Sequence, residues 1–271
     1  MKVIILASGS KGNATYIETN NTKILIDAGI SYNKLKERLL QFDILLDKLD
    51  AILITHEHID HVMHLAQIKK RTCAKVYINE DSYYNLPKTV TANLTDYNVF
   101  FIEPESKYQI GDLYFVPINL FHDTKSIYGY LFKNNDTNIA YITDTGHLLP
   151  KYYPLLRRMN VLILESNHDV EMLLNSKRDY RLKQRILSNK GHLSNEQCEN
   201  ILNEILSENT KHLVLAHLSE ECNTEDLAIK HASQAITNKN TKTNLLVGKQ
   251  HEPILIELED NCAKNIMCRK N

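Results

Sequence analysis

The chain has 271 residues, a length that favours one large α/β domain over two small ones, and we expect a single domain over residues 1–271. Lys and Arg number 32 against 33 Asp and Glu, which excludes a protein that grips nucleic acid over its whole surface but leaves room for a local basic patch. The longest apolar runs fall far short of the roughly 20 residues of a membrane span. The five cysteines form no CxxC pair, so we expect free thiols and a cytoplasmic protein.

Short runs rich in β-branched residues alternate with helical patterns along the chain. The first third predicts strands over Lys2–Ala7, Ala14–Glu18 and Lys23–Asp27, a helix over Tyr32–Phe42, a strand over Ala51–Thr55, a helix over His61–Arg71 and a strand over Lys75–Ile78. The middle predicts strands over Val99–Ile102, Leu113–Pro117, Tyr128–Phe132, Ile139–Thr143 and Val161–Leu164. The last third predicts helices over Arg178–Leu187, Asn195–Leu206 and Glu225–Thr237, with a strand over His212–Ala216. This order predicts an α/β fold of two sheets packed face to face with helices outside.

The strongest functional signal is the motif HxHxDH at residues 56–61, where a predicted strand ends and a helix begins. Side chains alternate along a strand, so His56 and His58 point the same way if the extended geometry continues, and the following turn brings Asp60 and His61 into the same space. Three imidazoles and a carboxylate are costly to bury without partners, but they are ligands that zinc and neighbouring metals prefer. A polar surface loop is the alternative, and four ligand-type side chains at this spacing weigh against it.

This motif directly after a buried strand resembles the signature of the metallo-β-lactamase superfamily, whose members fold as a four-layer αβ/βα sandwich. Other motifs of that family follow in the expected order: IDAG with Asp27, FHD with His122, TDTG with Asp144 and LAHLS with His217. The resemblance covers residues 1 to about 257 and implies a hydrolase of this fold. It also implies that Asp27 orients the HxHxDH loop through hydrogen bonds rather than by binding metal.

The resemblance further implies two divalent metal ions per chain, zinc in the first place and manganese or iron as alternatives. One ion would be held by His56, His58, His122 and Asp144, and the other by Asp60, His61, His217 and Asp144. Two such ions share a bridging hydroxide that acts as the nucleophile, and Asp60 is counted among the catalytic residues as well as the ligands. Phosphodiesters, thioesters, lactones and β-lactams all suit this chemistry, so the fold alone does not choose the substrate.

Two further motifs narrow the substrate. ESNHD with Glu165 and GHLSN with His192 come in the order seen in ribonuclease Z. Together with SGSxGN, THEHxDH, TDTG and LAHLS they resemble the YycJ (WalJ) type, bacterial proteins related to 5′→3′ DNA exonucleases. This resemblance implies that His192 is the general acid and that Glu165 orients it, which suits a departing 3′-oxygen that needs a proton. The alternative is a helix-capping role for Glu165, His168 and His192.

A basic stretch before GHLSN offers a place for the phosphates of a nucleic acid. Arg178, Arg181 and Arg185 recur at three and four residues, so we expect them to share one helix face and to contact the strand backbone. Asn167 and His168 are added as candidate substrate contacts. A solvated helix face is the alternative interpretation of such a run of charges.

We therefore expect a dinuclear metal-dependent phosphodiesterase, in the first place a 5′→3′ DNA exonuclease, with nucleic acid as its partner and no membrane. A homo-oligomer is left open. The span between Asp144 and His217 is too short for a β-CASP domain, and the span between His61 and His122 has no Gly/Pro-rich arm for tRNA, so a tRNA-specific role is disfavoured. Two alternatives remain: a small-molecule hydrolase of glyoxalase II or lactonase type, and a binding module without activity.

Overall fold

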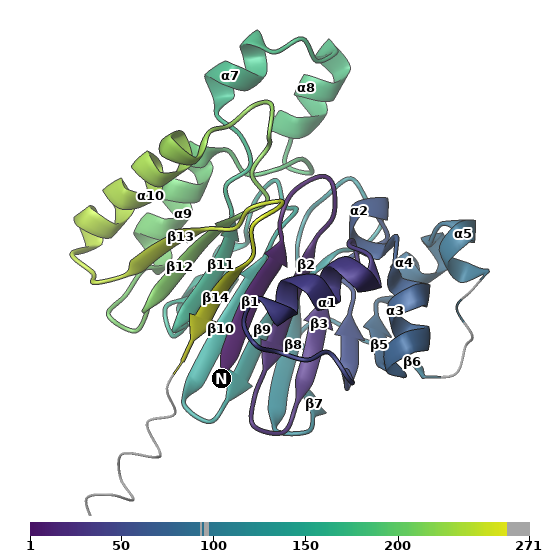
Figure 1. The fold of residues 1–271 in the computed structure, drawn as a ribbon. Helices are drawn as coiled ribbons and strands as arrows, with labels where there is room; N and C mark the ends of the chain where they lie inside the picture. Colours follow the sequence, from purple (N-terminus) through teal and green to yellow (C-terminus); the bar gives the residue numbers. More distant parts are fainter. Residues whose placement is uncertain (93, 95–97, 259–271) are drawn as a thin grey trace, which may run out of the picture.

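Two seven-stranded sheets pack face to face in the computed structural model, which describes residues 1–92, 94 and 98–258 (Figure 1). The first sheet has the order β14 (Ile254–Glu257), β1 (Lys2–Ala7), β2 (Ala14–Glu18), β3 (Lys23–Ile26), β4 (Ala51–Leu53), β5 (Lys75–Ile78) and β6 (Val99–Phe101). The second has the order β13 (Asn244–Val247), β12 (His212–Ala216), β11 (Val161–Glu165), β10 (Thr137–Ile142), β9 (Tyr128–Asn134), β8 (Leu113–Asn119) and β7 (Tyr108–Ile110). Both sheets are mixed, which confirms the predicted fold class.

Helices cover the outer face of each sheet (Figure 1). On the first sheet they are α1 (Tyr32–Leu40), α2 (Ile59–Val62), α3 (Leu65–Thr72), α4 (Glu80–Asn85) and α5 (Lys88–Thr91). On the second they are the 3₁₀ turn η1 (Pro150–Tyr152), α6 (Tyr153–Leu156), α9 (Asn195–Ile205) and α10 (Glu225–Lys239). The remaining pair, α7 (Val170–Asn175) and α8 (Tyr180–Leu187), stands out beyond the sheets at the top of Figure 1. None of the helices in the described part of the chain is long and apolar enough to span a membrane.

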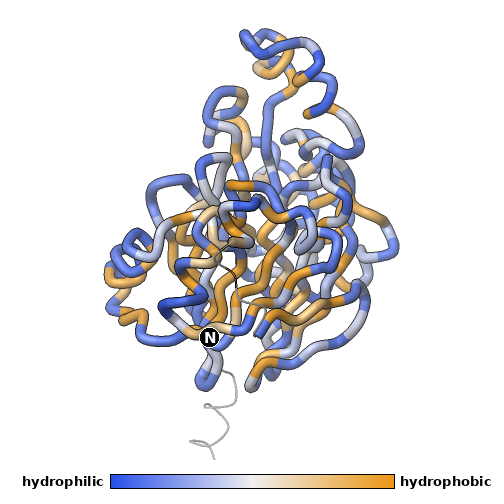
Figure 2. Tube along the Cα trace, turned by 90° about the vertical axis from the view of Figure 1, so that its right-hand side faces the viewer, coloured by the Kyte–Doolittle hydropathy of each residue, from blue (hydrophilic) through white to orange (hydrophobic). Residues whose placement is uncertain are grey.

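The buried apolar residues form one large cluster between the sheets and one under each helical layer, and a small fourth cluster joins α7 and α8. Strand β1 shows why: Val3 and Ile5 belong to the cluster between the sheets, whereas Ile4 and Leu6 belong to the cluster under the helices. Successive side chains of a strand point to opposite faces, so a strand buried on both faces is apolar throughout. Figure 2 shows hydrophobic segments running through the interior and hydrophilic ones following the outer turns.

The parallel strands of both sheets place their carboxyl ends along one edge of the sandwich. Strands β3 to β6 are parallel in the first sheet, and β10 to β13 are parallel in the second. In open α/β sheets the loops beyond the carboxyl ends of such strands form the ligand site. Six of the motifs singled out in the sequence lie at the ends of β3, β4, β8, β10, β11 and β12, whereas SGSxGN follows β1 and GHLSN lies between α8 and α9. Most side chains of the site are therefore delivered by strand ends.

The helix predicted over His61–Arg71 is interrupted. Helix α2 ends at Val62 and α3 begins at Leu65, because the backbone N–H of His64 donates to the carbonyl of Ala28 and takes the chain out of the first helix. The helix predicted over Arg178–Leu187 starts later, at Tyr180.

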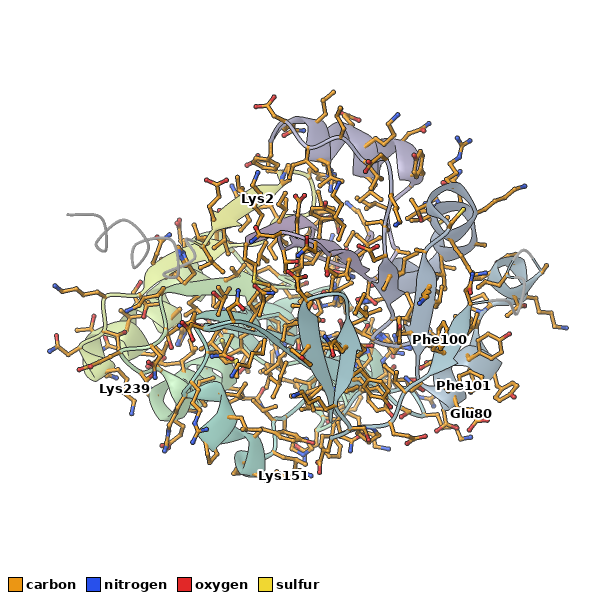
Figure 3. All side chains as sticks on the ribbon, turned by 90° about the horizontal axis from the view of Figure 1, so that it is seen from below. Lys2, Glu80, Phe100, Phe101, Lys151 and Lys239 are labelled. Carbon is orange, nitrogen blue, oxygen red and sulfur yellow. The ribbon has the colours of Figure 1, made fainter. Side chains whose placement is uncertain are left out.

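The cysteine prediction is confirmed for the described positions, since Cys73, Cys198 and Cys222 are free thiols. Cys262 and Cys268 lie outside the described residues. Seen from below, the labelled lysines Lys151 and Lys239 lie at the rim of the molecule, and Phe100 and Phe101 mark the edge strand β6 (Figure 3).

Candidate metal centre

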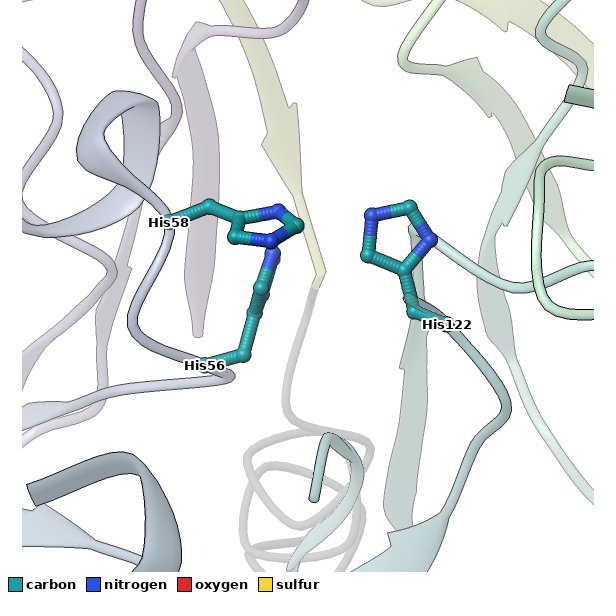
Figure 4. Close-up of side chains that lie close together, drawn as sticks. All are labelled: His56, His58 and His122. Carbon is teal, nitrogen blue, oxygen red and sulfur yellow. The ribbon is translucent and has the colours of Figure 1, made fainter. Parts of the chain in front are cut away.

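Ligand-type side chains from both sheets converge at the edge described above. They form four overlapping groups, each with ligand atoms within 4.8 Å of one another: His56, His58 and His122; His56, His61 and Asp144; Asp60, His61 and His217; and Asp144, Glu165, His192 and His217. Figure 4 shows that His56 and His58 share one loop and that the ring of His122 faces them from the other side. Every residue expected to bind metal is therefore in this cluster, and His64 is outside it.

Asp27 holds the HxHxDH loop from below. Its Oδ1 accepts the backbone N–H of Thr55 at 2.9 Å, and both of its oxygens lie 3.0 Å from the Thr55 hydroxyl. Its Oδ2 accepts the Nδ1–H of His61 at 2.8 Å. Asp27 belongs to none of the ligand-type groups among the described residues and contacts the loop through these hydrogen bonds.

The histidine rings are oriented by partners at Nδ1. The Nδ1 of His56 lies 3.0 Å from the Thr55 hydroxyl, and that of His122 donates to the carbonyl of Gly191 at 2.9 Å. The Nδ1 of His217 lies 3.2 Å from Oε1 of Glu165. Hydrogen bonds of this kind fix the tautomer of metal-binding histidines, because they leave Nε2 as the ligand atom.

Unpartnered buried atoms show that a metal fits this cluster. Among the described residues, His56 Nε2, His217 Nε2 and Asp144 Oδ2 are buried and accept or donate no hydrogen bond. Buried polar atoms are otherwise nearly always paired, since leaving one unsatisfied costs free energy. Imidazole nitrogens and a carboxylate oxygen are suitable ligands for a divalent cation such as zinc.

The electrostatics favour cations at one side of the cluster. Burial opposes charge on His217, but Asp144, Asp60 and Glu165 outweigh it and raise the pKa of His217 to about 10. Burial likewise opposes charge on His61, and Asp60 and Asp27 raise its pKa well above the usual value. These carboxylates thus attract positive charge strongly, and metal ions can take the place of the protons.

Two imidazoles on the opposite side of the cluster, those of His56 and His58, favour the neutral form. Burial lowers the pKa of His56 well below its usual value, and the neighbouring His61 and His122 lower it further. Burial also lowers the pKa of His58. Neutral imidazole is the form of histidine that binds metal, so these rings are ready to act as ligands.

Glu165 and His192 form a pair beside the ligands. Oε1 of Glu165 accepts the Nδ1–H of His192 at 2.7 Å, and Oε2 accepts the backbone N–H of Thr145 at 2.9 Å and of Leu193 at 3.2 Å. Glu165 is fully buried, and although burial opposes its charge, His192 and His217 hold its pKa below the usual value. The side chain of His192 is 17% exposed, so the ring stands between a buried carboxylate and solvent.

The helix-capping alternative does not describe these residues. Helix α7 is capped by the side chain of Asp169, and α9 is capped by Ser194, which forms a capping box with Gln197. Glu165 and His192 instead contact each other and belong to one ligand-type group with Asp144 and His217.

Asn167 and His168 lie inside the structure. The amide of Asn167 donates to the carbonyl of His217 at 2.7 Å and so supports the loop that carries this ligand. The ring of His168 is 1% exposed, neither nitrogen has a hydrogen-bond partner among the described residues, and burial lowers its pKa to about 4. Burial argues against the direct substrate contact expected for both residues.

The expectation that three arginines share one helix face is wrong for Arg178. Asp179 is the N-cap of α8, with its side chain accepting the backbone N–H of Arg181, so Arg178 precedes the helix. Its Nε lies 3.0 Å from Glu221. Arg181 is exposed, and Nη1 of Arg185 lies 3.1 Å from Oδ2 of Asp123. Arg185 thus connects the protruding helix pair to the metal edge.

Three site residues were missed by the sequence analysis. Asp123 follows His122 directly, and its Oδ1 lies 3.0 Å from Nε2 of His122. Glu57 accepts hydrogen bonds from Ser82 at 2.7 Å and from Thr124 at 2.5 Å. The amide of Asn13 lies 3.2 Å from Oδ2 of Asp60. The signals were available, because Asp123 extends a histidine motif and Asn13 ends the SGSxGN motif.

Three residues of the site have left-handed backbone. Asp27, Asp144 and His217 each come directly or one residue after a buried strand, with φ values of 60°, 58° and 56°. Residues other than glycine adopt this region rarely, and its occurrence often marks a functional site. The sharp turn there aims each side chain across the strand ends into the cluster.

Comparisons with known proteins agree with this geometry. Residues 22–218 match the family model of the β-lactamase superfamily domain. The chain is 34% identical over 235 residues to exodeoxyribonuclease YycJ of Bacillus anthracis, covering 87% of this chain and 89% of the relative. It is also 34% identical over 248 residues to exodeoxyribonuclease WalJ of Streptococcus pneumoniae, covering 91% of each. The metallo-β-lactamase fold protein YhfI of Bacillus subtilis superposes with a TM-score of 0.70 over 94% of this chain and 98% of that one, at 15% identity, which concerns the fold alone.

Proposed function

We propose that this chain, which belongs to the β-lactamase superfamily and is a metal-dependent hydrolase, removes nucleotides from the ends of DNA. The observation that carries this proposal is the pair of His192 and Glu165 beside the ligand cluster, with the Nδ1 of His192 2.7 Å from the carboxylate. The relatives named exodeoxyribonucleases, which match this chain over most of its length, support DNA as the substrate. A 5′→3′ direction is part of the proposal.

The cluster would hold two divalent ions, zinc in the first place and manganese or iron as alternatives. His56, His58, His122 and Asp144 would hold one, and Asp60, His61, His217 and Asp144 would hold the other. When bound, such ions lower the pKa of water and neutralise charge on a phosphate. Asp27 and Glu165 serve this arrangement by orienting His61 and His217.

His192 would supply the proton that the leaving group needs. Hydrolysis forms a bond between phosphorus and the oxygen of a water molecule and breaks the bond to the 3′-oxygen of the neighbouring nucleotide. Because Glu165 accepts the Nδ1–H of His192, Nε2 is the atom that can carry a proton to this departing oxygen. His192 and His217 keep Glu165 charged although burial opposes that charge, and the N–H groups of Thr145 and Leu193 hold the carboxylate in place, so the ring keeps its orientation during the reaction.

Arg181 and Arg185 would contact the substrate backbone from the protruding pair of α7 and α8. Six Lys and Arg residues face one Asp in residues 176–190, although the whole chain has a net charge of −1. Local positive charge of this kind binds phosphates by releasing counterions and makes binding sensitive to salt. Arg178 has a smaller part in this proposal, because it precedes α8 and its side chain is only 26% exposed, whereas that of Arg185, which pairs with Asp123 at the metal edge, is 60% exposed.

The test is hydrolysis of DNA labelled at one end, single-stranded and double-stranded, by the metal-loaded protein. We expect mononucleotides to be released from the 5′ end, and a chelator to stop the reaction. A thioester and a lactone serve as comparison substrates. Rapid hydrolysis of either one without hydrolysis of DNA would contradict the proposal and favour a small-molecule hydrolase of glyoxalase II or lactonase type.

A second test concerns the arginines. The variant with Arg181→Ala and Arg185→Ala should bind DNA more weakly, and the dependence of its affinity on salt should be flatter by about one unit of slope for each lost phosphate contact. The matched control carries Lys133→Ala and Lys239→Ala, which removes the same charge from exposed positions on β9 and α10. If the DNA affinity of the two double variants depends equally on salt, α8 is a solvated helix that does not contact the DNA backbone.

A further inference from the structure

A cleft of about 340 Å³ opens beside the metal cluster. Its walls are residues 119–122 and 124–127, from the segment that carries His122 between β8 and β9, together with Leu149 and Lys190. Small-ligand sites commonly have volumes of about 300–1,000 Å³, so this cleft has room for a group of the size of a nucleotide. Because His122 itself lines the cleft, an occupant would lie beside the metal centre.

The walls of the cleft match the two parts of a nucleotide. Leu120, Phe121 and Leu149 give an apolar side, and the ring of Phe121 stacks on His147 with ring centroids 4.1 Å apart. Lys125 and Lys190 give a cationic side. Aromatic rings bind nucleobases by stacking irrespective of sequence, and lysines bind phosphates.

Lys190 is the lysine that is better placed for a phosphate. Lys125 lies 2.6 Å from Asp81, so its charge is already paired. Lys190 is exposed and is followed by Gly191, whose carbonyl accepts the Nδ1–H of His122, and then by His192. One short turn thus carries the cation, the group that orients a metal ligand, and the proposed acid.

The turn that carries Lys190 has little freedom to move. A Cβ atom on Gly191 would lie 2.0 Å from the carbonyl oxygen of Ile186 and 2.3 Å from that of Arg185. The N–H groups of Gly191 and His192 donate to the carbonyls of Ser188 and Ile186. The backbone of the turn is therefore packed directly onto the end of α8, and the position of Lys190 relative to His122 is fixed.

We propose that this cleft binds one nucleotide of the substrate strand, with Lys190 contacting its phosphate and Phe121 its base. The inference rests on the proposed function, since it assigns a place to a nucleotide next to the reacting phosphate. It adds a specificity: substrates that carry a base and a phosphate are retained, whereas small esters without them have no such contact.

The test is the affinity of thymidine 5′-monophosphate for the metal-loaded protein, measured by calorimetry. Lys190→Gln should weaken binding by about tenfold, the loss expected for one charged contact to phosphate, and Lys190→Glu should weaken it further. The control Lys133→Gln, at an exposed position on β9, should bind as the wild type does. Metal content is measured for each variant, so that loss of affinity is not attributed to loss of metal.

The outcomes separate this inference from the proposed function. Equal affinities in wild type and both Lys190 variants would overturn the nucleotide subsite, even if the wild type degrades DNA. Weaker binding in the Lys190 variants of a protein that degrades no DNA would support the subsite and contradict the exonuclease proposal. Binding of thymidine as tight as that of its monophosphate would also overturn the role of Lys190.

Discussion

The two sheets supply the metal cluster in different ways. The first sheet delivers four ligand-type side chains from six consecutive residues after β4, and Asp27 at the end of β3 fixes that loop. The second sheet delivers His122, Asp144 and His217 one at a time, each after a different strand. The first half of the site therefore depends on local backbone geometry, whereas the second depends on the register of a whole sheet.

The largest effect should come from the second sheet, at Asp144. This residue belongs to two of the four ligand groups, one of which includes His56 and His61 from the first sheet. Asp144→Ala should lose at least one of two bound ions, and hydrolysis should fall by more than the roughly 10²–10⁴-fold that the loss of a positioned general acid costs. Elemental analysis of the purified variant measures the metal, with His64→Ala as the control that keeps both ions. Two full equivalents on the Asp144 variant would show that the sheets hold their ions independently.

A smaller effect is expected for the residue that stands outside the proposed ligand sets. If His192 gives a proton to the departing oxygen, His192→Ala should lower kcat by roughly 10²–10⁴-fold. Metal content should stay unchanged. A substrate whose leaving group is p-nitrophenolate needs no proton and should recover most of the lost rate.

The same variant can also refute this role. If His192→Ala hydrolyses DNA and the p-nitrophenyl substrate equally slowly, the substitution has disturbed the geometry of the site. If the variant has lost metal, His192 is a metal ligand. Metal content is measured because His192 belongs to one ligand-type group with Asp144 and His217.

The link between the two sheets can be weakened at Glu57. This residue lies between two ligands of the first sheet, and its carboxylate accepts hydrogen bonds from Ser82 and from Thr124, which is two residues after His122. Glu57→Ala should therefore lower metal affinity by roughly 10–100-fold, and Glu57→Gln, which keeps one acceptor oxygen, by less. Competition with a metal-binding dye measures the affinity, and the exposed Glu80→Gln is the control. An unchanged affinity in both Glu57 variants would mean that the sheets alone hold His122 in place.

The smallest effect concerns stability rather than the reaction. Burial lowers the pKa of His168, next to the second sheet, to about 4 from 6.5. As the pH falls below 6.5 the unfolded chain takes up a proton here that the folded protein refuses until about pH 4, so stability is lost across that window. The loss should reach up to about 3 kcal/mol.

Replacing this histidine should flatten the acid dependence. Thermal unfolding of wild type and His168→Gln between pH 6.5 and 4, both with chelator so that metal release contributes equally, measures the difference. The exposed His251→Gln should behave as the wild type does. Parallel curves for all three proteins would show that His168 is solvated or paired when the protein is folded.

The sequence predicted several inner strands well. Strands β1, β2, β5 and β12 have the predicted bounds. Nearly all residues of β1, β2 and β12 are buried, whereas β5 alternates buried residues with exposed or half-buried ones, and both patterns are visible in the sequence. It missed β7, β13 and β14, which are short strands at sheet edges with half-buried side chains and a weak pattern. An edge strand of this kind forms because it pairs with the adjacent strand of the sheet, and this pairing is not visible in the local sequence.

The site shows the same division. Motifs placed the ligand-type residues at strand ends, where the structure brings them together, but the contacts of Glu57 and Asp123 are with residues distant in sequence or on other elements. The periodicity of the arginines failed at Arg178, because one N-cap residue, Asp179, starts the helix later than the spacing suggested. The three- and four-residue spacing of side chains indicates that a helix is present, but it does not determine the residue at which the helix begins.

The left-handed backbone at Asp27, Asp144 and His217 limits how this centre can change during evolution. Each such residue raises the energy of the folded chain by roughly 1–3 kcal/mol, and glycine, asparagine and aspartate tolerate the conformation best. Asp144→Asn should therefore keep the fold while altering the ligand. A β-branched residue at position 144 should destabilise the fold and also remove the ligand. Asp144→Gly would relieve the strain and yield a more thermostable protein that no longer turns over substrate. At these three positions, the residues that favour thermal stability therefore differ from the residues that favour activity.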